Sequence, residues 1–239
     1  MSIQVNQLTK IYGKQVAVNE ISFNIPTGQI VGFLGPNGAG KSTTMKMITG
    51  YIPPSSGTGT VCGIDMVEDS LNVRKIVGYL PENNPLYLDM YVTEYLDFMA
   101  GLSGVTAIKS AVKNVISLTR LTAERHKKIG QLSKGFRQRV GLAQSLIHEP
   151  KVLILDEPTS GLDPIQVMEM RNVIKELGSE KTVMLSTHIM QEVEAMCHRV
   201  IIINQGKIVG DDTLDNLKNA KNQSMEEIFR NLTGHVDHI

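Results

Sequence analysis

Short apolar runs separated by turn residues fill the first part of the chain. The runs at 3–5, 16–18 and 21–25 have the composition of strands and are bounded by polar residues and glycine. After the turn Pro26-Thr27-Gly28, the apolar stretch 29–34 predicts a buried strand. The N-terminal part is therefore predicted to be mostly β.

Further along, apolar runs alternate with segments of helical periodicity. The runs at 152–155 and 182–185 predict buried strands, and residues 75–79 predict another. Residues 42–49 and 138–148 predict helices, the second ending before Pro150. Strands that alternate with helices favour a mostly parallel sheet.

One helical block interrupts this alternation. From Thr93 to about 122, apolar residues recur at helical spacing, with Thr93 as the expected N-cap and Glu94 in the first turn. We interpret residues 85–130 as an inserted helical subdomain. After about residue 211 the chain is polar and ends in an expected short helix, 225–232.

Charge and composition narrow the possible partners. Lysine plus arginine and aspartate plus glutamate both number 24, so the formal net charge is zero. A neutral chain is not expected to bind nucleic acid or an anionic membrane through bulk charge. No apolar run approaches the roughly 18 residues of a membrane span. Of the histidines, we predict that His235 and His238 are tail residues rather than metal ligands.

A glycine-rich stretch follows the first buried strand and matches the spacing of a phosphate-binding P-loop. Its glycines allow backbone N–H groups to surround a phosphate, and the helix after it directs its positive end at the same group. The lysine brings a full charge to the β- and γ-phosphates, and the serine hydroxyl is a ligand for Mg²⁺. The predicted ATP-binding residues here are Gly35, Pro36, Asn37, Gly38, Ala39, Gly40, Lys41, Ser42 and Thr43.

Two carboxylates end the strand at 152–155. Asp156 fits the acid that holds Mg²⁺ in P-loop proteins. Glu157, one residue later, is positioned to activate water for attack on the γ-phosphate. The alternative is a strand capped by two solvated acids.

His188 follows the apolar run 182–185. A lone histidine at a strand end is most often structural. Next to a phosphate site it is also a candidate donor to the γ-phosphate, since a neutral imidazole keeps one N–H.

The stretch Leu132-Ser133-Lys134-Gly135-Phe136-Arg137-Gln138 resembles the signature loop of ATP-binding cassette (ABC) ATPases. The resemblance covers nearly the whole chain in the expected order. It places Tyr12 as the aromatic that stacks on adenine and Glu82 in the position usually held by glutamine. Glu82 would contact Mg²⁺ and connect the ATPase core with the helical subdomain.

The resemblance implies a head-to-tail dimer in which the P-loop of one subunit and the signature of the other enclose each ATP. Ser133 and Gly135 would face the partner's phosphates, and the turn ending at Asp163, counted with the ATP-binding residues, would reach across the interface. Lys134 replaces the usual glycine of the signature and either approaches the partner's nucleotide or points to solvent. Phe136 replaces the usual glutamine, which puts the contact to ribose in doubt.

The implied fold is α/β: a P-loop NTPase (RecA-like) core with an N-terminal antiparallel β-subdomain and an inserted α-helical subdomain. We expect one nucleotide-binding domain over 1–239. Residues 1–84 and 131–210 would form the core and β-subdomain, 85–130 the helical subdomain leading to the signature, and 211–239 a short tail.

The implied activity is ATP hydrolysis with Mg²⁺ in a subunit that drives a separate membrane permease from the cytoplasmic face of the inner membrane. The signature variant resembles those that pair with ABC-2-type membrane proteins. Three runs resemble the ATP-binding subunits of gliding-motility-associated ABC transporters of Bacteroidetes, which implies a role in gliding and export: YLPENNPLYLDMYV, LSKGFRQRVGLAQ and VMLSTHIMQEVEAM. Alternatives are a soluble ABC ATPase acting on ribosomes or DNA, and a small-molecule kinase, which would not explain the signature.

Overall fold

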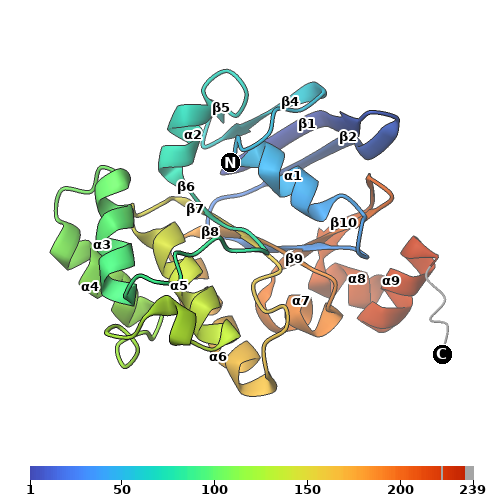
Figure 1. Ribbon diagram of the computed structural model, residues 1–239. Helices are drawn as coiled ribbons and strands as arrows, with labels where there is room; N and C mark the ends of the chain where they lie inside the picture. Colours follow the sequence, from blue (N-terminus) through green and yellow to red (C-terminus); the bar gives the residue numbers. More distant parts are fainter. Residues whose placement is uncertain (222, 235–239) are drawn as a thin grey trace.

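The computed structural model describes residues 1–221 and 223–234. Within these residues the strands form two sheets, with helices between the sheets and on the far side of the larger one (Figure 1). His235 and His238 lie outside the described residues.

The smaller sheet is antiparallel, with the strand order β2-β1-β4-β5. The three predicted N-terminal runs belong to two longer strands. Register shifts between β1 and β2 disturb the apolar alternation, which explains why the sequence pattern suggested shorter pieces. The strands are β1 (Ile3–Tyr12), β2 (Gln15–Ile25), β4 (Ser56–Val61) and β5 (Ile64–Asp65).

The larger sheet has the order β10-β9-β3-β8-β7-β6, and only its edge strand β10 runs antiparallel to its neighbour. The predicted mostly parallel sheet is confirmed. The edge hairpin was not predicted. The strands are β3 (Ile30–Leu34), β6 (Val77–Leu80), β7 (Val152–Asp156), β8 (Thr182–Thr187), β9 (Arg199–Asn204) and β10 (Lys207–Thr213).

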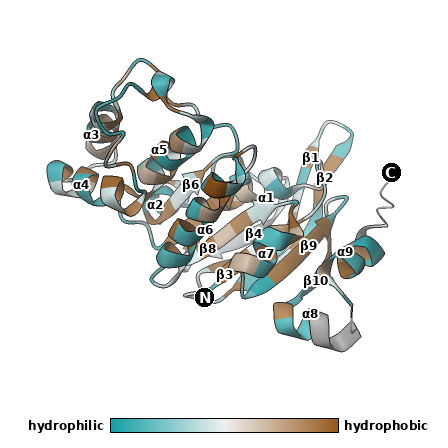
Figure 2. Cartoon of the chain, turned by 90° about the horizontal axis from the view of Figure 1, so that it is seen from below, coloured by the Kyte–Doolittle hydropathy of each residue, from teal (hydrophilic) through white to brown (hydrophobic). Residues whose placement is uncertain are grey.

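Both faces of the larger sheet are covered at its centre, so the strands β3 and β7 are buried at every position. In β7, Val152 and Ile154 face α1 (Lys41–Ile48) and the smaller sheet, whereas Leu153 and Leu155 face the remaining helices. Figure 2 shows hydrophobic colour running through β3 and β9, while much of α9 (Met225–Thr233) is hydrophilic. The P-loop NTPase fold predicted from the sequence is therefore the observed one.

The helical block differs from its expected form. It consists of two helices, α3 (Val92–Leu102) and α4 (Ile108–Leu118), separated by a turn in which Gly104 has φ +74°. The N-cap is Tyr91 and not Thr93, because the Glu94 side chain bonds the Tyr91 N–H at 3.2 Å. The Thr93 hydroxyl instead donates to the Arg125 carbonyl at 2.8 Å.

Two other predicted boundaries are wrong. Residues 75 and 76 end the helix α2 (Ser70–Ile76), and the strand begins only at Val77. The helix expected from residue 138 is α5 (Lys134–Leu146), which begins directly after the N-cap Ser133. A short 3-10 turn, η1 (Ile129–Gln131), precedes it.

The remaining helices are α6 (Pro164–Gly178), α7 (Met190–Met196), α8 (Leu214–Lys221) and α9. The predicted domain boundary at 210 falls inside β10, and α9 buries Met225, Ile228 and Phe229 in the main core. No helix within the described residues is long and apolar enough to cross a bilayer.

Candidate functional site

The glycine-rich loop joins β3 to α1 and brings backbone close to backbone. A Cβ on Gly35 would lie 2.4 Å from the Ile203 carbonyl oxygen, and one on Gly40 would lie 2.6 Å from that of Ala17. Gly40 is the N-cap of α1, with φ +108°, a conformation that glycine alone adopts readily. Since a glycine cap supplies no oxygen to the first N–H groups of the helix, these groups can bind an anion.

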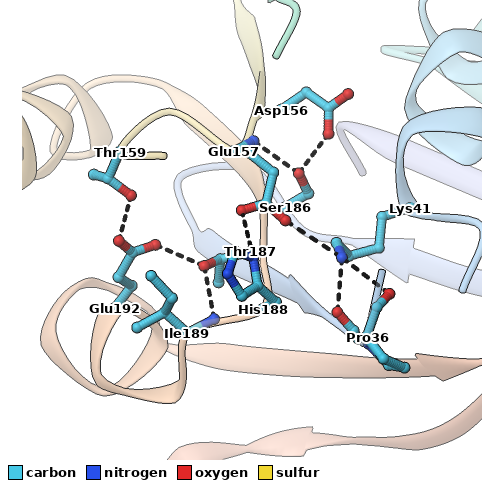
Figure 3. A network of polar contacts seen from close by, with 11 residues as sticks. Pro36, Lys41, Asp156, Glu157, Thr159, Ser186, Thr187, His188, Ile189 and Glu192 are labelled. Atoms are coloured by element: carbon cyan, nitrogen blue, oxygen red, sulfur yellow. Dashed lines mark hydrogen bonds and ion pairs between the residues drawn. The ribbon is translucent and has the colours of Figure 1, made fainter. Parts of the chain in front are cut away.

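Lys41 is buried behind this loop. Its ammonium donates to the Gly35 carbonyl at 2.7 Å and the Pro36 carbonyl at 3.2 Å, and its Nζ lies 3.3 Å from Glu157 Oε1 (Figure 3). The lysine and the glutamate side chains are only 6% and 8% exposed. A full positive charge is thus held where the loop would surround a phosphate.

Glu157 stands at the end of β7 in an unusual backbone conformation. Its φ is +49°, in the left-handed region that non-glycine residues seldom occupy. Ser186 Oγ accepts the Glu157 N–H at 2.9 Å and itself donates to Asp156 Oδ1 at 2.6 Å. The serine of the neighbouring strand therefore fixes both acids at this edge of the sheet.

The Glu157 carboxylate lies between a cation and an imidazole. One oxygen faces Lys41, and His188 Nδ1 lies 3.0 Å from the other (Figure 3). The His188 side chain is 43% exposed, so it is the part of this trio that solvent or a ligand reaches most easily. The expected base and the expected phosphate sensor are thus in direct contact.

A cleft of about 500 Å³ opens in front of these groups. It brings together the β1–β2 hairpin, the glycine-rich loop, the loop after β6 and the segments that follow β7 and β8. Gln15, Ala17 and Ser160 line it and were not predicted. The predicted residues that line it are Tyr12, Asn37, Gly38, Gly40, Lys41, Ser42, Thr43, Glu82, Glu157 and His188.

Tyr12 ends β1 and pairs with Gln15 across the hairpin. The tyrosine is 48% exposed, and Lys10 Nζ lies 5.3 Å from its ring centroid. An exposed aromatic face at the rim of the cleft is available for stacking on a flat ring.

Asp156 lies beneath the cleft and is 1% exposed. Tyr79, on the adjacent strand β6, has its pKa raised first by burial and then by the negative charges of Asp156 and Glu82, with a further contribution from Tyr51. Among the described residues, its hydroxyl has no hydrogen-bond partner. The carboxylates of Asp156 and Glu82 thus both act on the Tyr79 hydroxyl at this end of the sheet.

The donor set suits Mg²⁺ that arrives with a nucleotide. No group of three or more histidine, cysteine, aspartate or glutamate side chains among the described residues could hold a metal alone. Mg²⁺ typically binds one or two protein oxygens and takes its other ligands from phosphates and water. The Ser42 hydroxyl and the Asp156 and Glu82 carboxylates are ligands of that kind.

The signature residues Ser133 and Gly135 lie away from the cleft and do not line it. Ser133 Oγ accepts the Phe136 N–H at 3.4 Å and the Gln166 side-chain amide at 3.2 Å. A Cβ on Gly135 would lie 2.2 Å from Gln166 Oε1. Sequence reasoning missed Gln166, because only the fold brings α6 against α5.

Asp163 also lies outside the cleft lining and caps α6. Its Oδ1 accepts the N–H groups of Ile165 at 3.1 Å and Gln166 at 3.0 Å. Lys134 is exposed. A Cβ added to Gly161, in the turn before α6, would lie 2.2 Å from the Lys134 ammonium. The turn before α6 and the signature loop are therefore neighbours within one chain.

Comparison with known proteins gives a consistent result. The family model described as "ABC transporter" matches residues 18–160. The bacitracin transport ATP-binding protein BcrA of Bacillus licheniformis is 38% identical over 226 residues, covering 94% of this chain and 74% of that protein. The lantibiotic transport ATP-binding protein SrtF of Streptococcus pyogenes is 37% identical over 230 residues, covering 96% of each.

Solved structures share the fold. The structure of an ATP-binding subunit of an ABC transporter superposes with a TM-score of 0.86 at 27% identity, covering 97% of this chain and 99% of that one. The dimeric MJ0796 cassette, bound to ADP and Pi after hydrolysis, has a TM-score of 0.81 at 24% identity, covering 89% of this chain and 98% of that one.

Proposed function

Because the chain belongs to the ABC transporter family and is an ATPase, we propose that it powers a separate membrane subunit as a head-to-tail dimer that encloses two ATP molecules. The observation that carries this proposal is the cleft in which Tyr12, the glycine-rich loop, Glu157 and His188 meet. Adenine and the phosphates each have a matching group there. Adenine stacks on the tyrosine, and the phosphates meet the loop, Lys41 and the N-terminus of α1.

The chemical step uses Glu157 as general base. In the structure its carboxylate contacts Lys41 and His188. When phosphate oxygens take over the lysine and the histidine, the carboxylate is freed to accept a proton from the attacking water. A base placed in this way typically contributes about 10²–10⁴-fold in rate.

Mg²⁺ would neutralise phosphate charge during this step. We assign its protein ligands to Ser42 and Asp156, with Glu82 as a third candidate. Ser42 and Glu82 line the cleft, and the Asp156 carboxylate keeps one oxygen outside its contact with Ser186.

Ser133, Gly135 and Asp163 would serve the nucleotide of the partner subunit. Ser133 Oγ accepts two N–H groups, which use its two lone pairs, so its hydrogen remains available to donate to a phosphate. The serine also caps α5, whose N-terminus attracts anions. Because the subunit has its own phosphate loop elsewhere, a second anion site suits a second copy of the chain.

A membrane permease would dock on the face formed by the loop after β6 and by α3. Large exposed side chains gather there: Tyr87 (56%), Leu88 (48%), Tyr91 (48%) and Phe98 (49%). Tyr87 lies 6.2 Å from Phe98 between ring centroids, so at least these two form a continuous apolar surface. Exposed aromatic clusters are typical of binding surfaces.

Glu82 would link nucleotide state to this face. Two backbone hydrogen bonds tie its loop to the segment before the signature, from Gly130 N–H to the Leu88 carbonyl (2.8 Å) and from Ile129 N–H to the Met90 carbonyl (2.9 Å). A shift of Glu82 toward Mg²⁺ can therefore be passed to the helical subdomain, residues 85–130, and to the signature loop.

The finer assignment is an exporter of the ABC-2 type, active at the cytoplasmic face of the inner membrane. The names of BcrA and SrtF, which refer to bacitracin and lantibiotic transport, support transport of this kind. The resemblance of the three sequence runs quoted above supports a role associated with gliding.

Affinity purification from detergent-solubilised membranes tests the proposed function. The transporter subunit is expected to carry a polytopic membrane protein with it. Recovery with ribosomes or DNA alone would contradict the proposal and favour the soluble ABC ATPase.

A further inference from the structure

A buried carboxylate lies behind the cleft and has no role in the steps above. Glu192 sits in α7 and is 1% exposed. A carboxylate removed from water is costly unless hydrogen bonds satisfy it. Here Thr159 Oγ1 donates to Oε1, and Thr187 Oγ1 donates to Oε2 at 2.6 Å (Figure 3).

The two hydroxyls come from two separate segments of the chain, a turn and the end of β8. Thr159 lies two residues after Glu157 in the turn that leads to Asp163, and Thr187 immediately precedes His188. Both threonines are buried, at 3% and 0% exposure. The Glu192 side chain thus bridges the turn after Glu157 and the end of β8 before His188.

Hydrogen bonds to the backbone hold both segments where their threonines contact Glu192. Thr187 Oγ1 accepts the Ile189 N–H at 3.0 Å, which fixes the backbone on both sides of His188. In the turn, Ser160 N–H bonds the Glu157 carbonyl at 3.1 Å, and Leu162 N–H bonds the Thr159 carbonyl at 3.2 Å. A displacement of this turn therefore moves Thr159, and the carboxylate passes it to Thr187.

We propose that Glu192 is a positioning residue that makes the turn 159–163 and His188 move as one unit. The proposal rests on the proposed dimer, in which this turn meets the partner subunit. Arrival of the partner would then shift His188 relative to Glu157 and release the carboxylate for water. Glu192 itself touches neither nucleotide nor water in this account.

A purely structural role predicts something different. Val193 and Met196 already bury one side of α7 in the main core. If Glu192 only anchored the helix, its loss would lower the melting temperature and would leave turnover per folded molecule unchanged.

The first test replaces Glu192 by glutamine, with Glu180→Gln, at an exposed glutamate after α6, as the control. Glutamine keeps the size of the side chain but offers one oxygen, so one threonine hydroxyl loses its acceptor. We expect kcat for ATP hydrolysis to fall about tenfold, since small misplacements at reacting centres cost up to about 10²-fold. The ATP dissociation constant should stay the same, because Glu192 does not line the cleft. The control should match the unsubstituted chain.

The second test asks whether the two hydroxyls act together. Thr159→Val and Thr187→Val each remove one donor at similar volume. If Glu192 couples the two segments, the double variant loses no more kcat than the worse single variant. The inference would be overturned if the losses of kcat in the two single variants multiply in the double variant. An unchanged kcat in Glu192→Gln would overturn it as well.

His188→Ala in the same series separates this inference from the function on which it rests. If His188→Ala keeps full turnover, the proposed role of the histidine fails. If it is inactive while Glu192→Gln is fully active, only the positioning role fails.

Discussion

Lys41 and Glu157 form a buried ion pair that ATP must separate. Each side chain is under 10% exposed, and their charged atoms are 3.3 Å apart. Removing one partner of such a pair leaves an uncompensated buried charge. The same lysine thus balances the charge of Glu157 and is expected to bind phosphate when ATP arrives.

Lys41→Ala should therefore weaken ATP binding strongly, by about tenfold or more, because it removes a charge-assisted bond to the phosphates. Direct titration with a fluorescent ATP analogue measures this. Lys46→Ala, in the last turn of the same helix, is the matched control and should bind normally. Equal affinities of the two variants would count against the phosphate contact.

At this scale, sequence motifs predicted most of the residues that line the cleft, but not Gln15, Ala17 and Ser160 and not the residues that support the site. Lys41, Glu157 and His188 belong to short motifs with a fixed chemical purpose. Ser186 and Glu192 are ordinary polar residues whose partners lie 30 and 33 positions away. Only the strand order of the sheet brings such pairs together.

Helix boundaries were the weaker part of the sequence-based prediction at the scale of elements. Helix α5 begins at Lys134 because Ser133 caps it, whereas the apolar face on which the prediction relied starts later. A glycine in the first turn further weakens the helical pattern, since glycine has a low helix propensity. The cap matters to the proposed function because Ser133 is also the residue that we assign to the partner's phosphate.

Ser133→Ala should affect stability and activity separately. Loss of the cap is expected to lower the free energy of unfolding by about 1 kcal/mol. Turnover should fall much further, because the hydroxyl that we assign to the partner's phosphate is gone, while ATP binding to the monomer is kept. Urea unfolding and ATPase assays on one preparation measure both. A loss of turnover no larger than the loss of folded protein would contradict the assignment.

The exposed aromatic face of the helical subdomain gives a second test at this scale. Tyr87→Ala should reduce co-purification of the membrane subunit several-fold, since exposed aromatics often dominate binding interfaces. Basal ATPase activity of the isolated chain should not change, because Tyr87 does not line the cleft. Leu71→Ala, at 70% exposure on α2, is a control of similar exposure. If Tyr87→Ala still retains the membrane subunit, the membrane subunit docks on another face of the chain.

At the scale of the whole molecule, the two covered faces of the larger sheet explain why its fully buried strands β3, β7 and β8 were easy to find. A strand covered on both sides is apolar at every position, which gives a strong sequence signal. The segment after residue 211 has no such signal. Its helix α9 is polar on one side and buries only one face, so the sequence suggested a loosely attached tail.

Phe229→Ala tests whether α9 belongs to the folded core. The side chain is 8% exposed and packs in the main cluster. Truncating a buried phenylalanine typically costs about 3–5 kcal/mol. Chemical denaturation should show a loss of that order, whereas a midpoint unchanged from that of the unsubstituted chain would mean that α9 is dispensable.

The central claim is that two copies of this chain enclose ATP and that Glu157 limits the lifetime of the dimer. Light scattering coupled to size-exclusion chromatography of Glu157→Gln tests it most directly. With ATP the variant should elute at the mass of two chains and hydrolyse ATP at least about 10²-fold more slowly. Without nucleotide, or with Ser133→Ala added, it should elute mostly as a monomer. A Glu157→Gln variant that stays monomeric with ATP bound, or that hydrolyses ATP at the normal rate, would contradict the account.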